Sequence, residues 1–292
     1  MIKLEKRISI IGGDLRIIKL INMMIDDGFK VYSYGIELAE DIDRVIHCNT
    51  VEEAISNSDV VIGPIPFTTN MQDVNMPFSN NKVEINQLID LLEGKTFIAG
   101  SIRKEIYALG EGKNINFIDL LDREELTVLN AISTAEGAIQ IAMEETEITL
   151  HGSNILVLGF GRVGKILAKM LDGIGAKVDC EARRDEPLAW IKAYGYNPVR
   201  LEDIDKNLGK YDTIINTVPS ILLDEERLKL LKKQCLIIDL ASTPGGVDKK
   251  AAKELGIKLV WALSLPGKVA PATSAEYIKE TVYNIINEMK KQ

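Results

Sequence analysis

The stretch "VLGFGRVGKILAKMLDGIGAKVDCEARRDE" (Val157–Glu186) decides the fold, because it reads as strand, turn, helix and second strand. Gly159, Gly161 and Gly164 form a G-x-G-x-x-G pattern directly after an apolar run and at the head of a helical run. In that context the glycines permit a tight turn, close approach of the backbone to a pyrophosphate, and close helix–strand packing. The stretch predicts a unit that binds a dinucleotide at the amino end of its helix.

The end of the second strand departs from the pattern of NAD-binding units, which carry an acidic residue there for the adenosine ribose. Here that position falls near Ala182, and Arg183 and Arg184 follow. Side-chain alternation turns Glu181, one residue earlier, to the other face of the strand. A guanidinium binds a 2′-phosphate through paired N–H donors, so Arg183, assisted by Arg184, favours NADP. The alternative is that Glu181 rotates toward the ribose and the cofactor is NAD.

The rest of the chain alternates short β-branched runs with segments of helical period, as in parallel sheets covered by helices. Two consecutive sets of strands are expected, at residues 7–11, 30–34, 59–63, 96–99 and 115–118, and at 154–158, 177–181, 212–217, 236–240 and 259–262. Residues 70–84 are polar and lack a period, which indicates a flexible or ligand-covering excursion. The predicted fold class is therefore α/β, with two doubly wound Rossmann-like domains that flank a cleft.

Domain boundaries follow from this alternation, and 292 residues fit two domains of roughly 150 residues each. We expect a first domain over residues 1–130, joined by the C-terminal helix 276–292, and a second domain over residues 131–275. A long helix at about residues 135–147 would connect them. The first domain lacks the G-x-G-x-x-G pattern, so only the second is expected to bind the dinucleotide.

The cofactor site is expected at the carboxyl ends of the strands, where doubly wound sheets bind their ligands. Besides the glycine turn and the arginine loop, two strand ends carry small or polar residues, in "INTVP" and "IDLAS". The predicted cofactor contacts are Gly159, Gly161, Arg162, Val163, Gly164, Ala182, Arg183, Arg184, Asn216, Thr217, Val218, Pro219, Ala241 and Ser242.

Composition excludes several classes of function. A net charge of −8 does not provide the basic surface that nucleic-acid binding needs. Cys48, Cys180 and Cys235 lack the spacing of a metal or disulfide pattern, so no metal site is expected and the thiols are interpreted as small buried hydrophobes. The sequence shows neither a signal-peptide pattern nor an apolar run of about 20 residues, so a cytoplasmic protein without a membrane span is expected.

Several motifs occur in a fixed order along the chain: "IGGD", "TAEGAIQIAM", "LHGS", "VLGFGRVG", "INTVP" and "LPGKVAP". In this ordered set the sequence resembles the A subunits of bacterial dipicolinate synthases over essentially its whole length. That family is similar in turn to the two-domain 2-hydroxyacid dehydrogenases. The resemblance implies an NADP-dependent dehydrogenase that oxidises dihydrodipicolinate, or its hydrated precursor, to dipicolinate during sporulation. It also implies a location in the mother-cell cytoplasm and, as partner, a smaller, flavoprotein-like B subunit; self-association is expected as well.

A dicarboxylate substrate requires cationic and hydrogen-bonding partners. Arg16 and Arg103 could bind a carboxylate with two N–H groups and Lys268 could act as a point charge. Thr134 is expected to head a helix whose free N–H groups attract an anion, although Ser133 and Glu136 equally fit a capping box. The predicted substrate contacts are Asp14, Arg16, Arg103, Ser133, Thr134, Glu136 and Lys268. Replacing Arg16 with Ala is expected to raise the Michaelis constant before it harms folding.

No catalytic residue is assigned, because neither His47 nor His151 lies in a motif like the His–acid pair of hydroxyacid dehydrogenases. Two alternatives stay open. The chain could be a dehydrogenase of another small dicarboxylate or amino acid, or an NADP-binding regulatory or scaffold subunit whose partner performs the chemistry.

Overall fold

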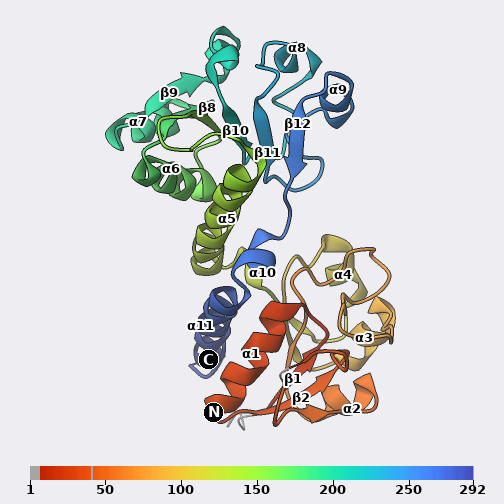
Figure 1. The fold of residues 1–292 in the computed structure, drawn as a ribbon. Coiled ribbons are helices and arrows are strands. Elements are labelled where there is room, and N and C mark those ends of the chain that lie inside the picture. The colour runs from red at the N-terminus through yellow and green to blue at the C-terminus, as the bar shows by residue number, and fades with distance from the viewer. Residues whose placement is uncertain (1–6, 41, 292) are drawn as a thin grey trace. The chain divides into compact units, whose positions relative to one another are not determined.

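The computed structural model describes residues 7–40 and 42–291, and the contacts within it divide the chain into two compact units. Unit 1 comprises residues 1–129 and 270–292, and unit 2 comprises residues 130–269. Each unit contains one six-stranded sheet in which every pairing of neighbouring strands is parallel (Figure 1). The predicted α/β class with two Rossmann-like sheets is confirmed.

The sheet of unit 1 has the strand order β3-β2-β1-β4-β5-β6. Its strands are β1 (Arg7–Ile11), β2 (Lys30–Tyr34), β3 (Ile46–His47), β4 (Val60–Ile62), β5 (Thr96–Ala99) and β6 (Asn116–Asp119). Its helices are α1 (Leu15–Asp26), α2 (Val51–Ser56), α3 (Ile85–Leu91), α4 (Lys104–Leu109), the short 3-10 helix η1 (Leu120–Asp122), the first part of α5 (Glu124–Glu145) and α11 (Pro271–Met289).

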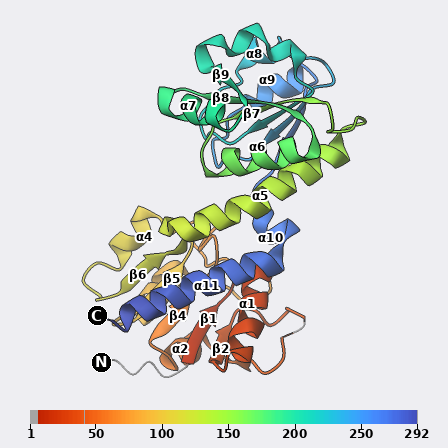
Figure 2. The same ribbon diagram turned by 90° about the vertical axis from the view of Figure 1, so that its left-hand side faces the viewer.

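The two faces of this sheet are buried by different helices. Ile8 and Ile10 of β1 point to one face, where they pack with apolar residues of α1 and α11. Ile11 points to the other face, which α2, α3 and α4 cover. The C-terminal helix α11 lies beside α1, although about 250 residues separate them in sequence (Figures 1 and 2). This two-sided burial explains why the central strands β4 (VVI) and β5 (TFIA) are almost entirely apolar, as in other parallel sheets.

The sheet of unit 2 has the order β12-β11-β10-β7-β8-β9. Its strands are β7 (Asn154–Leu158), β8 (Lys177–Ala182), β9 (Asn197–Arg200), β10 (Thr213–Asn216), β11 (Leu236–Asp239) and β12 (Lys258–Trp261). Its helices are the second part of α5, α6 (Arg162–Ile174), α7 (Asp185–Ala193), η2 (Leu201–Lys206), η3 (Leu208–Lys210), α8 (Glu225–Leu228), α9 (Lys249–Glu254) and α10 (Leu265–Val269).

Two elements differ from the sequence expectations. The edge strands β3 and β9 were not expected, because one has two residues and the other contains Pro198, which is tolerated at a sheet edge. Helix α5 begins at Glu124, eleven residues before the expected start. The reason is that Thr134, which suggested a helix start, lies inside α5 and donates its hydroxyl to the Asn130 carbonyl oxygen at 2.8 Å.

The polar excursion at residues 70–84 is anchored to the sheet of unit 1. Val74 and Val83 are buried, and the Val74 amide donates to the Val83 carbonyl at 2.9 Å. The Gly13 amide donates to the Asn75 carbonyl at 3.1 Å, so the segment covers the turn after β1. A Cβ atom on Gly12 would lie 2.5 Å from Cγ of Met76, which explains the glycine in this turn.

A buried carboxylate orders the loop that carries Arg103. Asp119, at the end of β6, accepts the amides of Ser101 at 3.0 Å, Ile102 at 2.6 Å and Leu121 at 2.8 Å. We expect Asp119→Ala to lower the free energy of unfolding by at least about 2 kcal/mol, because these amides lose their acceptor. Urea unfolding against the exposed-site control Asp122→Ala measures the difference; equal midpoints for the two variants would contradict this role.

Candidate functional site

The glycine turn between β7 and α6 has the geometry that its sequence predicts. Gly159 adopts φ +89°, and a Cβ atom there would lie 2.6 Å from Oγ1 of Thr217. A Cβ atom on Gly164 would lie only 2.1 Å from the Gly159 carbonyl oxygen. A side chain at position 164 would separate α6 from the strand end, and one at position 159 would meet the loop after β10. Space therefore requires glycine at both positions, and the left-handed conformation requires it at Gly159 as well.

The amino end of α6 is open. Gly161 is the N-cap residue and makes no side-chain capping bond, and a Cβ atom on it would meet no described atom within 4 Å. The first amides of a helix have no partners within it, and the helix dipole favours an anion beside them. The predicted contacts Arg162 and Val163 form the first turn of this helix, with Arg162 exposed. The turn therefore fits a pyrophosphate.

Two arginines follow β8 directly. Ala182 ends the strand and is buried in the cluster that also contains residues of α6 and α7. Arg183 and Arg184 are both exposed, and Arg184 is the residue before α7. An alanine at the strand end offers no acceptor to a ribose hydroxyl, and two exposed arginines follow it directly in sequence. These facts are consistent with a phosphate-bearing ribose.

Glu181 points to the opposite face of the sheet from Ala182. It is 1% exposed, and its Oε2 accepts the Gly159 amide at 3.2 Å. Its Oε1 is buried without a hydrogen-bond partner in the described part of the chain. Burial is the main influence on this carboxyl group and raises its pKa, although Gly159, Arg183 and Arg227 act in the opposite direction. The residue that the sequence offers as a ribose ligand is thus buried behind the turn.

Two loops after β10 and β11 are joined by a buried polar pair. Nδ2 of Asn216 donates to Asp239 Oδ1 at 2.7 Å and to the Val218 carbonyl at 3.0 Å. Asp239 also accepts the amides of Ala241 at 3.1 Å and Gly246 at 2.8 Å. Asn216 and Asp239 are fully buried, so they support the predicted cofactor loops from within the protein through these hydrogen bonds. Asp239 is absent from the predicted contacts; its only sequence signal is an acid at the end of an apolar strand.

Strand register brings the predicted cofactor residues to one edge of the sheet. Leu158, the last residue of β7, pairs with Glu181 on one side and with Asn216 on the other, and Asn216 pairs with Asp239. Oγ1 of Thr217 donates to the Leu158 carbonyl at 2.9 Å, which ties the β10 loop to the glycine turn. The ends of β8, β7, β10 and β11 therefore lie next to one another. Val218, Pro219 and Ser242 are at least partly accessible there, whereas Ala241 is buried.

Arg16 is committed to a neighbour instead of being available to a substrate. It is 4% exposed, its Nε lies 3.1 Å from both carboxylate oxygens of Asp14, and its Nη2 lies 2.8 Å from Oδ2. Nη2 also donates to the Ile65 carbonyl. Asp14 thus occupies the guanidinium group that was expected to bind a substrate carboxylate. Asp14 also caps α1, because it accepts the Arg16 amide at 3.0 Å.

The remaining predicted substrate residues lie on several elements. Ser133, Thr134 and Glu136 are inside α5, so the expected helix start and capping box at these residues are wrong. Ser133 is buried and Glu136 is exposed. Arg103 is exposed at the residue before α4 in unit 1, and Lys268 is exposed on α10 in unit 2. Of the seven residues, the structure places Asp14 and Arg16 in direct contact.

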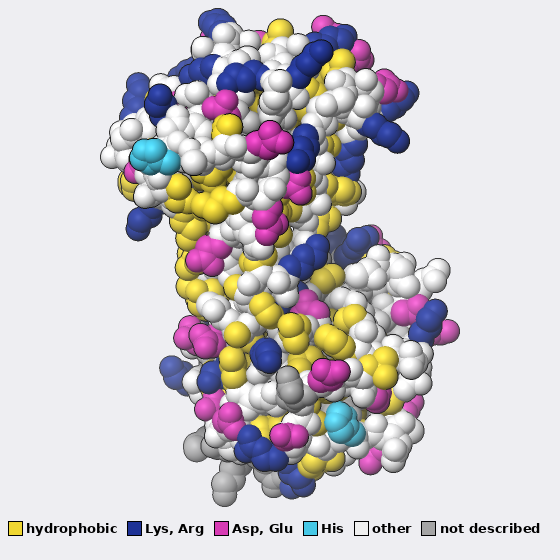
Figure 3. All heavy atoms as spheres, viewed as in Figure 1, with side chains coloured by type: hydrophobic (Ala, Val, Ile, Leu, Met, Phe, Trp, Pro, Cys, Tyr) yellow, Lys and Arg dark blue, Asp and Glu magenta, His cyan; other side chains and the backbone are white. Residues whose placement is uncertain are grey.

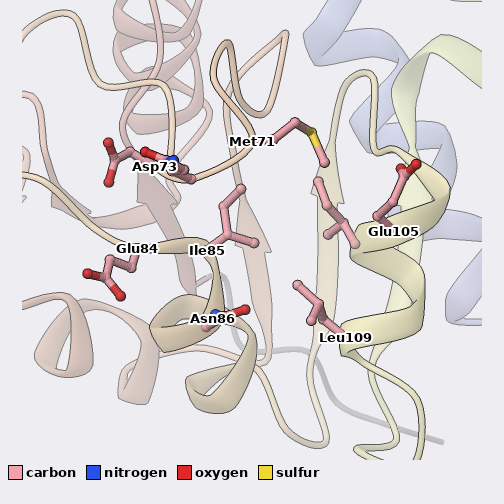
Figure 4. A pocket seen from close by; sticks show the side chains of 9 residues that line it. Met71, Asp73, Glu84, Ile85, Asn86, Glu105 and Leu109 are labelled. Carbon is pink, nitrogen blue, oxygen red and sulfur yellow. The ribbon is translucent and has the colours of Figure 1, made fainter.

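One pocket of unit 1, of about 420 Å³, contains none of the predicted residues (Figure 4). Met71, Ile85 and Leu109 contribute apolar walls, whereas the carboxylates of Asp73 and Glu84 point away from these side chains in Figure 4. The Oδ2 atom of Asp73 accepts the side-chain amide of Asn70 at 3.1 Å. This arrangement shows no group of charges directed at a common point.

The histidine and cysteine side chains differ in exposure. His47 and His151 are both exposed, and both histidine side chains are visible at the surface in Figure 3. The three thiols are buried, and burial raises the pKa of Cys235 to about 12. Within residues 7–40 and 42–291, no three His, Cys, Asp or Glu side chains are grouped as a metal site would require.

None of the described helices is both long and apolar enough to cross a bilayer.

The paired state of Arg16 changes what its replacement should do. Arg16→Ala is expected to lower the free energy of unfolding by about 2 to 3 kcal/mol, because it leaves Asp14 and a buried carbonyl without their charged partner. Arg44→Ala, which breaks the exposed pair with Asp26, should cost less than about 1 kcal/mol. Urea unfolding compares the two variants. Unchanged stability of Arg16→Ala together with a raised Michaelis constant would restore Arg16 as a substrate ligand.

Two family models match the chain, one in each unit. The model that describes the N-terminal domain of dipicolinate synthase A subunits matches residues 7–121, and the model described as D-isomer specific 2-hydroxyacid dehydrogenase, NAD binding domain, matches residues 130–254. The second match covers the glycine turn, the arginine loop and the paired loops after β10 and β11. The open turn therefore belongs to a domain type that binds a nicotinamide cofactor.

Relatives match over the full length. The chain is 32% identical to the dipicolinate synthase A subunit of Bacillus subtilis, covering 98% of this chain and 97% of the relative. The crystal structure of the dipicolinate synthase A subunit from Bacillus halodurans superposes with a TM-score of 0.88 at 30% identity, covering 96% and 97% of the two chains. D-lactate dehydrogenase from Escherichia coli, at 14% identity and a TM-score of 0.64 over 98% of each chain, shares the fold. The chain thus belongs to the family of dipicolinate synthase A subunits and is an NAD(P)-dependent oxidoreductase.

Proposed function

We propose that this chain is the dehydrogenase subunit of a dipicolinate synthase and oxidises dihydrodipicolinate, or its hydrated precursor, to dipicolinate during sporulation. The observation that carries the proposal is an open, intact dinucleotide turn within a chain that matches the A subunits of dipicolinate synthases along its whole length. The mother-cell cytoplasm is the proposed location.

NADP is the proposed cofactor. The strand end that would hold an acid for NAD carries the buried Ala182, and the exposed Arg183 and Arg184 follow it. A charge-assisted hydrogen bond from a guanidinium to the 2′-phosphate contributes about 1.5–3 kcal/mol. The proposed neighbours of the rest of the cofactor are the backbone at Gly161 and the loops that Asn216 and Asp239 hold.

The chemical demand on the protein is modest. A nicotinamide, when bound, would supply the hydride acceptor, and the dihydropyridine would lose a proton as it becomes aromatic. Aromatisation makes the oxidation downhill, so the protein has mainly to position the substrate and balance its two carboxylates. Arg103 and Lys268 are the proposed partners of the carboxylates, because both are accessible cations at helix ends. Arg16, held by Asp14, is not among them.

A partner subunit is part of the proposal. The B subunit is proposed to be a smaller, flavoprotein-like protein, and this chain is proposed to associate with itself as well.

A second candidate function is favoured by one observation on the histidines, which are the usual general bases of dehydrogenases. Both histidines are exposed, and Nδ1 of His151 lies 3.1 Å from the Ile174 carbonyl oxygen. In that case this chain would bind NADP in a regulatory role, and the partner would carry out the oxidation.

The arginine loop can be tested by three substitutions. Arg183→Ala should weaken NADP binding about ten- to a hundred-fold and leave NAD nearly unchanged, since about 1.4 kcal/mol corresponds to tenfold. Arg184→Ala should have a smaller effect, and Ala182→Asp should weaken NADP while it offers NAD a ribose acceptor. Fluorescence titration of NADPH and NADH against the three variants measures both affinities. Equal loss of both cofactors in Arg183→Ala would contradict the assignment.

The division of labour between the two proteins can be tested by activity. The isolated chain with NADP should oxidise dihydrodipicolinate, and adding the B subunit should raise the rate. Absorbance of the reduced nicotinamide follows the reaction, and product analysis identifies dipicolinate. Activity that appears only when both proteins are present, combined with NADP binding by this chain alone, would favour the regulatory role. A different dicarboxylate as the preferred substrate would contradict the proposed reaction.

A further inference from the structure

Glu181 is a buried ionisable group in direct contact with the dinucleotide turn. It is 1% exposed, one carboxyl oxygen accepts the Gly159 amide at 3.2 Å, and the other has no hydrogen-bond partner within the described residues. Leaving a buried polar atom unpaired is costly, and more so when the group is charged. A hydrophobic residue at this position would avoid that cost.

We propose that Glu181 couples dinucleotide binding to the uptake of a proton, and that the coupling is stronger for a cofactor with a 2′-phosphate. The inference rests on the proposed binding of NADP at the glycine turn. It adds a residue that determines how affinity and cofactor preference depend on pH.

The charged groups around Glu181 determine whether a bound ligand raises or lowers its pKa. Arg183, two residues further along, and Arg227 of α8 both favour the carboxylate. Arg227 is already engaged, because its Nε lies 2.8 Å from Asp205 Oδ1 and its Nη1 donates to the Leu222 carbonyl. Asp179, on the same face of β8, is paired with Lys210 and accepts the Tyr211 hydroxyl. Of the two cations that favour the ionised form of Glu181, Arg183 is exposed and Arg227 is partly buried, so Arg183 is the one that an incoming phosphate would reach.

Two effects then act in the same sense. A pyrophosphate at the turn brings negative charge close to the Glu181 carboxylate, and a 2′-phosphate on Arg183 neutralises a cation that favours the ionised form. Both raise the pKa of Glu181 in the complex above its value in the free protein, which burial has already raised. By linkage the dinucleotide binds most tightly where Glu181 is protonated, and affinity is lost as pH rises through the range between the free and bound pKa values. Each pKa unit corresponds to about tenfold in affinity.

Isothermal titration calorimetry of the full chain tests this coupling. NADPH and NADH are titrated in pairs of buffers that differ in ionisation enthalpy, at several pH values upward from the ordinary glutamate pKa of about 4.3. The wild type should take up a fraction of a proton with NADPH and less with NADH. Glu181→Gln, which keeps an oxygen for the Gly159 amide, should lose this uptake and show a flatter pH dependence. The matched control Glu186→Gln, at an exposed acid of α7, should behave like the wild type.

The 2′-phosphate itself titrates near neutral pH, but it keeps the same partner in the wild type and in Glu181→Gln, so the difference between these two proteins isolates the glutamate. Equal proton uptake by these two proteins would overturn the inference. If Glu181→Gln does not fold, Glu181→Met replaces it and should likewise lose the uptake; no change, or no uptake by the wild type with either cofactor, would overturn the inference. Failure of the wild type to bind either cofactor would instead overturn the proposed function.

Discussion

The close approach of α6 to the end of β7 is the constraint on which unit 2 depends. The helix can start directly above the strand only because Gly164 places no atom against the Gly159 carbonyl oxygen, where a Cβ atom would lie 2.1 Å away. That contact fixes where the first amides of α6 point and leaves the space above Gly161 open. Hydrogen bonds tie the neighbouring segments to the same turn. On one side Thr217 donates to the Leu158 carbonyl, and on the other side Glu181 accepts the Gly159 amide.

Both units order the loops at their sheet edge with a buried aspartate at the end of a strand. Asp119 of unit 1 accepts three amides of the adjoining segments, and Asp239 of unit 2 accepts two amides and the side chain of Asn216. A carboxylate with several backbone donors is well compensated despite its burial. Glu181 differs, because one of its oxygens is unpaired within the described residues. Asp119 and Asp239 therefore stabilise loops, whereas Glu181 is the carboxylate whose ionisation we propose to respond to a ligand.

Arginine has opposite roles at two strand ends of this chain. Arg16 is buried, and Asp14 occupies its guanidinium, so it holds the start of α1 in place. Arg183 is exposed directly after a strand whose last residue is alanine. Both arginines follow a strand by a few residues, and both were expected to bind ligand. The sequence neighbourhood is similar in the two cases. Burial and the adjacent Asp14 give Arg16 a structural role, whereas exposure leaves Arg183 accessible to a ligand.

The sequence by itself determined the two parallel sheets, the glycine turn and the arginine loop, because these depend on patterns within a few residues: apolar runs, glycine spacing and the residue at a strand end. Tertiary structure decided where α5 begins, that Thr134 bonds back to Asn130 inside that helix, and that Asp14 occupies Arg16. It also decided that Asn216 pairs with Asp239, 23 residues away, and that Glu181 reaches the Gly159 amide, 22 residues away. Polar side chains choose partners by distance and burial in the folded chain, which local spacing does not specify.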